Sequence, residues 1–187
     1  MMYGPIVDEC HRLLERALAE RGDVLNEAVA SCVTSLKAGR KILAFGNGGS
    51  AAEAQHFTAE LVNKFTKARP ALRAVSLATD ISVLTSIGND ASFDSIFSRQ
   101  IEALGDAGDV VLALSTSGRS PNVLKGLMAA REKKMVTIGL TGKGGGKMAA
   151  LCDHLLDVPS SDTPRVQEVH LVFLHIIAGE IEKRIFI

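Results

Sequence analysis

The 187-residue sequence has no net charge, no closely spaced cysteines and no long apolar run. Its 21 basic and 21 acidic side chains cancel, so no general attraction to nucleic acid or to an anionic membrane is expected. Cys10, Cys32 and Cys152 are odd in number and far apart, which favours small buried side chains in a reducing compartment over a disulfide framework. No apolar run could cross a bilayer, and charged residues interrupt the N-terminus where a signal peptide would be apolar. We therefore predict a cytoplasmic protein that binds neither nucleic acid nor membrane.

The composition is that of an ordinary globular protein, with 47% hydrophobic and 22% charged residues. The length suits one domain with a full core and is too short for two. We predict a single domain over residues 1–187, in which a helical segment, 1–38, precedes a sheet core and final helix, 39–187.

The stretch from Lys41 to Lys64 organises the rest of the chain. It begins with an apolar run, Ile42–Phe45, that predicts a buried strand, and continues through the glycine-rich turn Gly46–Ser50 into a helix. Free amide N–H groups at a helix start point into such a turn and bind anions of phosphate size. Ser50 with Glu53 three residues later is a capping-box pattern, which predicts where the helix begins.

Strands and helices alternate through the middle of the chain. This alternation predicts an α/β fold, a three-layer sandwich of flavodoxin type with helices on both faces of a five-stranded parallel sheet. The almost wholly apolar strands agree, because parallel strands are buried on both faces. The expected strands are 42–45, 73–77, 109–114, 135–140 and 155–158, and the expected helices after the first loop include 81–87, 93–104, 121–131, 148–151 and one from Thr163 towards Lys183.

The helical pattern of residues 5–37 comes before any strand. Gly22-Asp23 divides it, so two helices or one interrupted helix are expected. Its apolar faces need a partner, which is either the flank of the sheet or the same helices of another subunit. We favour the second.

A second loop, Ser115–Ser120, offers four hydroxyl groups directly after a strand. Ser120 followed by Pro121 marks a helix start, so the loop can hold a phosphate monoester. It lacks the glycines and the Lys-Ser/Thr pair of a Walker loop, which argues against nucleotide hydrolysis. Both loops can face one crevice, since ligands sit beyond the carboxyl ends of parallel strands.

His56 and Glu60 project from one face of a helix. They can form a solvated surface pair, a metal half-site or an acid–base pair. The final helix must supply the remaining groups. Its periodicity allows either His170 or His175 beside Gln167 and does not choose between them.

Several of these motifs together resemble the phosphoheptose isomerases, a family of sugar-isomerase (SIS) domain proteins that convert sedoheptulose 7-phosphate to D-glycero-D-manno-heptose 7-phosphate for lipopolysaccharide-core and other heptose pathways. The resemblance covers almost the entire chain. The segments that carry it are 46–50, 54–57, 60–61, 88–90, 115–118, 140–142 and 165–170.

The resemblance implies an aldose–ketose isomerase that works through an enediol, with one zinc ion per subunit and a homotetramer in which the leading helices take part and the site lies between subunits. It implies Glu60 as the base and His175 as its partner, and it selects His175 over His170. The substrate contacts it implies are Asn47, Gly48, Gly49, Glu60, Asn89, Asp90, Ser115, Thr116, Ser117, Ser120 and Gln167. The zinc ligands it implies are His56, Glu60, Gln167 and His175.

Two residues depart from the family pattern. Lys64 stands where many members have arginine, which keeps the charge but loses the guanidinium fork. Arg119 stands where a small polar residue is common, and it either adds a phosphate contact or points to solvent.

A related subfamily with the same fold is a binding adaptor of the DnaA replication initiator, so the fold alone does not decide the function. That subfamily lacks the counterparts of Glu60 and His175, both of which this chain has. The alternatives to a phosphoheptose isomerase are therefore such an adaptor, or an isomerase of another sugar phosphate.

Overall fold

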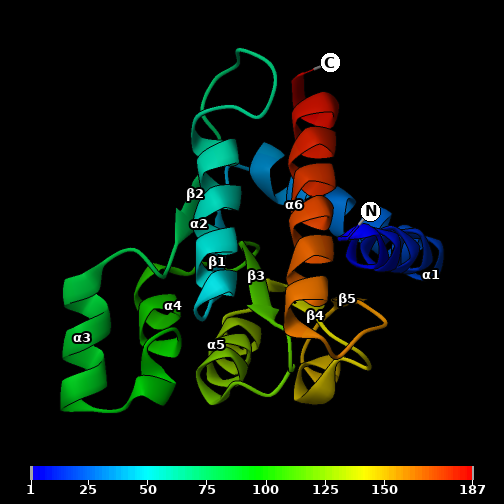
Figure 1. The fold of residues 1–187 in the computed structure, drawn as a ribbon. Coiled ribbons are helices and arrows are strands. Elements are labelled where there is room, and N and C mark those ends of the chain that lie inside the picture. The colour runs from blue at the N-terminus through cyan, green and yellow to red at the C-terminus, as the bar shows by residue number, and fades with distance from the viewer. Residues whose placement is uncertain (1, 187) are drawn as a thin grey trace.

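The computed structural model describes residues 2–186; residues 1 and 187, the two ends of the predicted domain, lie outside it. A five-stranded, all-parallel sheet with the order β2-β1-β3-β4-β5 forms the centre (Figure 1). Each strand lies within one residue of its predicted bounds: β1 Ile42–Gly46, β2 Ala74–Ser76, β3 Val110–Ser115, β4 Val136–Thr141 and β5 His154–Asp157. The predicted fold class is confirmed.

Helices cover both faces of the sheet. Successive residues of a strand point to opposite faces, so each strand contributes side chains to two separate cores. Ile42 and Ala44 belong to a core shared with α1, α2 and α6, whereas Leu43 and Phe45 belong to a core shared with α4 and α5, with α3 at its edge. The helices are α1 Gly4–Lys37, α2 Gly49–Val62, α3 Ile81–Asp90, α4 Ser98–Leu104, α5 Pro121–Glu132 and α6 Thr163–Phe186, with 3-10 turns at Phe93–Ser95 and Gly146–Ala150.

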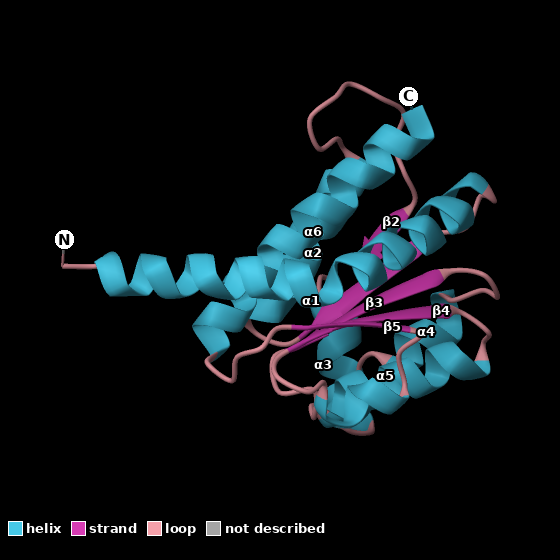
Figure 2. Cartoon of the chain, turned by 90° about the vertical axis from the view of Figure 1, so that its right-hand side faces the viewer, coloured by secondary structure: helices cyan, strands magenta, loops and turns pink. Residues whose placement is uncertain are grey.

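The first helix differs from prediction. α1 runs without a break through Gly22, because packing offsets the roughly 1 kcal/mol that a helical glycine costs. One face of α1, formed by Ala17, Leu25, Ala28, Val29 and Cys32, is buried in the core shared with the sheet and α6. This part of the helix therefore packs within its own chain, which was the less favoured alternative. Only the first turns project from the body of the molecule (Figure 2), and there Tyr3 and Val7 are 63% and 62% exposed.

Three local predictions need correction. α2 begins at Gly49 after Gly48, whose φ is 55°, and it has no side-chain cap hydrogen bond, so Ser50 is not its cap. The helix expected over 81–87 continues to Asp90, so that Asn89 and Asp90 lie in the last turn of α3. The predicted helix over 93–104 is divided into a 3-10 turn and α4, and Phe93 is 62% exposed.

Other local predictions hold. Ser120 precedes α5 with Pro121 in its first turn, and α6 begins at Thr163. Cys32 is buried as expected, while Cys10 and Cys152 are partly exposed, and all three thiols are free. Within residues 2–186, every helix is too short or too polar to span a bilayer.

Candidate functional site

The serine loop, residues 115–120, gathers its hydroxyl groups at the carboxyl end of β3. The Oγ of Ser115 lies 3.4 Å from that of Ser117 and 3.0 Å from that of Ser120. Ser115 is buried, whereas Ser117 is exposed and Thr116 and Ser120 are partly exposed. The loop therefore presents several hydroxyl donors to one spot at the start of α5, as a phosphate group requires.

A glycine-rich turn, residues 142–146, supports the serine loop from behind. The amides of Gly142 and Lys147 donate to the carbonyls of Thr116 (2.9 Å) and Gly118 (2.8 Å). Gly118 has a φ of +60°, and a Cβ there would come within 2.1 Å of the carbonyl oxygen of Gly145. Only glycine fits at this position, so the conformation of the serine loop depends on this close contact.

The first loop closes the other side of the same space. The side-chain amides of Asn47 and Asn122 exchange two hydrogen bonds of 2.9 Å, and Gln167 of α6 reaches Ser50 at 3.4 Å. A cavity of about 250 Å³ is lined by Asn47, Gly49, Ser50, Leu114, Ser115, Thr116, Ser117, Ser120, Thr163 and Gln167. The cavity lies beyond the carboxyl ends of the neighbouring strands β1 and β3. From these two strands the sheet continues to β2 on one side and to β4 on the other, and ligands of such sheets bind in the crevice at this point.

His56, Glu60 and His175 come together farther along α2 and α6, which lie side by side (Figure 1). The Nε2 atoms of the two histidines are 2.8 Å apart, and His56 Nε2 lies 3.5 Å from a carboxylate oxygen of Glu60. The Glu60 side chain is 21% exposed. A hydrogen bond between these two ring nitrogens requires one of them to donate and the other to accept.

The two histidines of α6 have different environments in the structure. His170 is fully buried, and its Nε2 donates to the carbonyl of Thr141 at 3.1 Å. Burial lowers the pKa of His170 to about 4, against the smaller effect of that hydrogen bond. His170 is therefore a neutral core residue, and His175 is the histidine that α6 presents beside His56.

Other expected site residues do not join these groups within the chain. Gln167 lies at the cavity, eight residues or about 12 Å of helix rise before His175. Asn89 and Asp90 hydrogen-bond to each other at 2.8 Å, and Asp90 lines a different cavity with residues of α3 and α4. Among residues 2–186, no group of three or more His, Cys, Asp or Glu side chains is arranged to hold a metal ion. The predicted zinc and substrate sets thus remain predictions.

Glu53 is a partly buried carboxylate close to the candidate site, and the sequence pattern suggested it only as part of a helix cap. It lies on α2 between Ser50 and His56, and one of its carboxylate oxygens is buried without a hydrogen-bond partner. Burial raises the pKa of Glu53 to about 7, although a hydrogen bond with Ser50 opposes the shift. Its seven-residue spacing from Glu60 on one helix face was the signal that could have revealed it.

Comparison with known proteins places this fold and site in a class. Residues 7–142 match the SIS domain family. The chain is 51% identical to a phosphoheptose isomerase of Nitratidesulfovibrio vulgaris over 89% of this chain and 80% of that protein, and 54% identical to one of Geobacter sulfurreducens over 92% and 90%. The structure of a phosphoheptose isomerase from Neisseria gonorrhoeae superimposes with a TM-score of 0.92, at 43% identity, over 97% of both chains. The chain belongs to the phosphoheptose isomerase family of SIS-domain proteins.

Proposed function

We propose that the protein converts sedoheptulose 7-phosphate to D-glycero-D-manno-heptose 7-phosphate through an enediol, as the first step of heptose precursor synthesis for lipopolysaccharide core. The observation that carries the proposal is the group formed by His56, Glu60 and His175. α6 carries two histidines, and the one it presents here is His175, whose ring contacts His56, which in turn lies beside the Glu60 carboxylate.

The chemistry follows from the side chains available. Aldose–ketose isomerisation moves a proton between C1 and C2, and a fixed carboxylate such as Glu60 can take it from one carbon and return it to the other. His175 lies where it can exchange a proton with the sugar oxygens or assist ring opening. The serine loop would bind the phosphate, and Asn47, Gly48, Gly49 and Gln167 would contact the sugar, so that binding far from the reacting carbons holds them in place.

We further propose that the site is completed between subunits of a homotetramer. Ten helical residues, about 15 Å of rise, separate Ser50 from Glu60 on α2, and Asn89 and Asp90 lie apart from both groups within one chain. The exposed apolar residues at the start of α1, Tyr3 just before the helix and Val7 in its first turn, offer a surface for such an assembly. A cytoplasmic location also remains a prediction.

The family implies a zinc ion, and the side chains fit it in part. Two imidazoles and a carboxylate are typical zinc donors, yet within one chain they fall short of a complete ligand group. His56, Glu60 and His175 would hold the ion, with Gln167 supplied where subunits meet. Zinc would stabilise negative charge on the enediol oxygens.

Metal analysis tests this assignment. We expect about one zinc per subunit after purification without chelators, and a loss of most of it in His56→Ala, because one of few nitrogen ligands is removed. His11→Ala, at an exposed position on α1, should retain the metal. Equal zinc content in His56→Ala and the unaltered protein would exclude His56 as a ligand.

The proposed reaction is tested by incubating the purified protein with sedoheptulose 7-phosphate and detecting the aldose product. We expect turnover in the presence of zinc. Absence of turnover with and without added zinc would refute the proposal. Binding of the DnaA initiator by the inactive protein would then support the adaptor, and turnover of a different ketose phosphate would support an isomerase of another sugar.

The two departures from the family pattern bear on substrate contact. Arg119 is exposed and lines a cavity of about 270 Å³ with Thr116, Ser117, Lys143, Ser161 and Thr163, next to the serine loop. We propose that it adds a contact to the substrate phosphate. Lys64 is exposed in the loop that follows α2, four residues beyond Glu60.

A further inference from the structure

Glu182 near the end of α6 holds the loop that follows α2. This loop, residues 63–73, contains no helix or strand and rises beside the C-terminal end of α6 (Figure 1). The Glu182 carboxylate accepts hydrogen bonds from three successive backbone amides, those of Phe65 (3.1 Å), Thr66 (3.2 Å) and Lys67 (2.9 Å), and from the Thr66 hydroxyl at 2.7 Å. The main-chain conformation of the loop is therefore set by a side chain 115 to 117 residues away.

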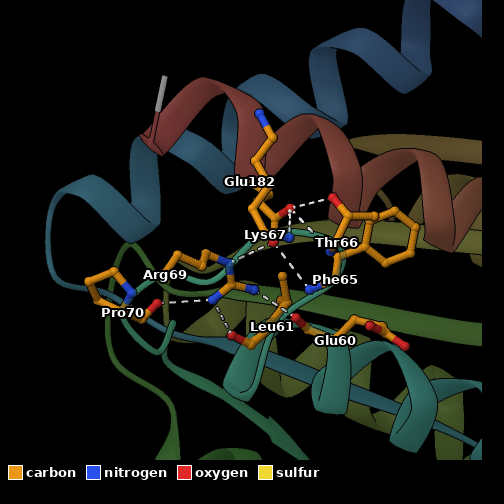
Figure 3. Close-up of polar contacts among 8 residues, drawn as sticks. All are labelled: Glu60, Leu61, Phe65, Thr66, Lys67, Arg69, Pro70 and Glu182. Carbon is orange, nitrogen blue, oxygen red and sulfur yellow. Dashed lines mark hydrogen bonds and ion pairs between the residues drawn. The ribbon is translucent and has the colours of Figure 1, made fainter.

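Arg69 completes the arrangement (Figure 3). Its Nε donates to Glu182 at 3.0 Å, and its terminal nitrogens donate to the carbonyls of Glu60 (2.7 Å), Leu61 (2.9 Å) and Pro70 (3.0 Å). The two side chains are only 2% and 3% exposed. The guanidinium thus satisfies carbonyls in the last turn of α2, where a positive charge is favourable. We call Arg69 and Glu182 the clamp.

The hydrogen bonds to Glu182 favour its charged form. Burial opposes ionisation of Glu182, but the hydrogen bonds from Thr66 and from the amides of Phe65 and Lys67 outweigh it and lower the pKa to about 2. A buried ion pair is weak evidence for stability, since apolar residues of similar volume often stabilise a fold as well. The presence of this buried pair is therefore better explained by the geometry that it imposes on the loop and on α2 than by a contribution to stability.

The clamp is linked to both Glu60 and His175, the proposed acid–base pair. Arg69 hydrogen-bonds the backbone carbonyl of Glu60 itself. The ring of Phe65, whose amide Glu182 binds, lies 5.5 Å from the ring of His175. Phe65 also sits over Gly179, where a Cβ would come within 3.3 Å of the ring, so the ring is confined between the loop and α6.

We propose that Arg69 and Glu182 are positioning residues for the isomerisation: the clamp fixes the last turn of α2 and the Phe65 ring, and so sets Glu60 and His175 relative to each other. This inference rests on the proposed roles of Glu60 and His175. Neither clamp residue contacts the cavity at the serine loop, so the clamp should affect the chemical step and not phosphate binding.

Steady-state kinetics of Arg69→Lys and Glu182→Gln with sedoheptulose 7-phosphate test the proposal. Lysine keeps the charge but cannot bond Glu182 and the α2 carbonyls together, and glutamine brings donors where only acceptors fit. We expect kcat to fall by about 10- to 100-fold, the effect of a small misplacement of reacting groups, with KM little changed. Assays run well below the melting temperature of each variant separate this from unfolding.

The matched control is Glu180→Gln, two residues away on the same helix, where the glutamate pairs only with Lys183 and Arg184 near the surface. It should leave kcat unchanged. If a single clamp variant does not fold, Arg69→Met/Glu182→Met removes both buried charges together, and Thr66→Val removes one hydrogen bond to Glu182. The first should show the same loss of kcat, and the second a smaller one.

Three results would overturn the proposal: an unchanged kcat in folded clamp variants, a raised KM with unchanged kcat, or an equal loss in the Glu180 control. Glu60→Gln assayed in parallel separates the two levels of inference. If Glu60→Gln is inactive and the clamp variants are normal, only the clamp fails. If Glu60→Gln is fully active, the proposed acid–base role fails, whatever the clamp variants do.

Discussion

Replacement of Glu60 by glutamine should lower kcat by about 10²- to 10⁴-fold, the usual contribution of a positioned acid–base group. Glutamine has nearly the same shape but cannot accept the proton that passes between the two carbons. The substitution leaves the backbone carbonyl of Glu60, which Arg69 binds, in place. The serine loop is also unaffected, so KM should change little. Initial rates with sedoheptulose 7-phosphate across a range of concentrations give both constants.

Glu102→Gln is a suitable control for this experiment. The Glu102 side chain is 52% exposed and pairs only with Arg99 on α4, so the charge is lost without any effect expected on the reaction. If Glu60→Gln kept the turnover of the unaltered protein, Glu60 would not be the base. A large rise in KM with kcat preserved would instead make Glu60 a binding residue.

His170 should make the folded state sensitive to acid. Its pKa lies at about 4 in the folded protein, against 6.5 for an ordinary histidine, so below pH 6.5 the unfolded chain binds a proton that the folded protein resists. The free energy of unfolding should therefore fall as the pH drops from about 6.5 towards 4, by up to about 3 kcal/mol. His170→Gln, which keeps a donor for the Thr141 carbonyl, should remove most of this dependence.

Thermal or urea unfolding at several pH values between 4 and 8 measures the effect, and His11→Gln serves as the control because the His11 side chain is 69% exposed. Glu53 contributes with the opposite dependence. Its pKa is raised to about 7, so its contribution is lost as the pH rises through that value. The difference in unfolding free energy between His170→Gln and the unaltered protein, taken at each pH, gives the contribution of His170 alone. Identical pH curves for the two proteins would show that His170 does not resist protonation.

The sequence by itself determined the sheet and the position of both loops. Apolar strands such as Ile42–Phe45 have no polar face, so they had to be covered on both sides, and alternation with helices then required parallel pairing. Ser120 and Pro121 marked the start of α5 through local backbone preferences. His56 and Glu60 shared a helix face because their spacing alone puts them there. Each of these features depends on residues close together in the chain.

Only the tertiary structure decided which side chains meet across the chain. Periodicity could not choose between His170 and His175, because the packing of α6 against α2 and β4 determines which one is buried. Gly22 favoured a break in α1 that packing prevents. The pairing of Arg69 with Glu182 joins residues 113 positions apart, and no local sequence pattern predicts it. Long-range contacts of this kind depend on how helices pack on the sheet, and in this protein they position the proposed acid–base pair.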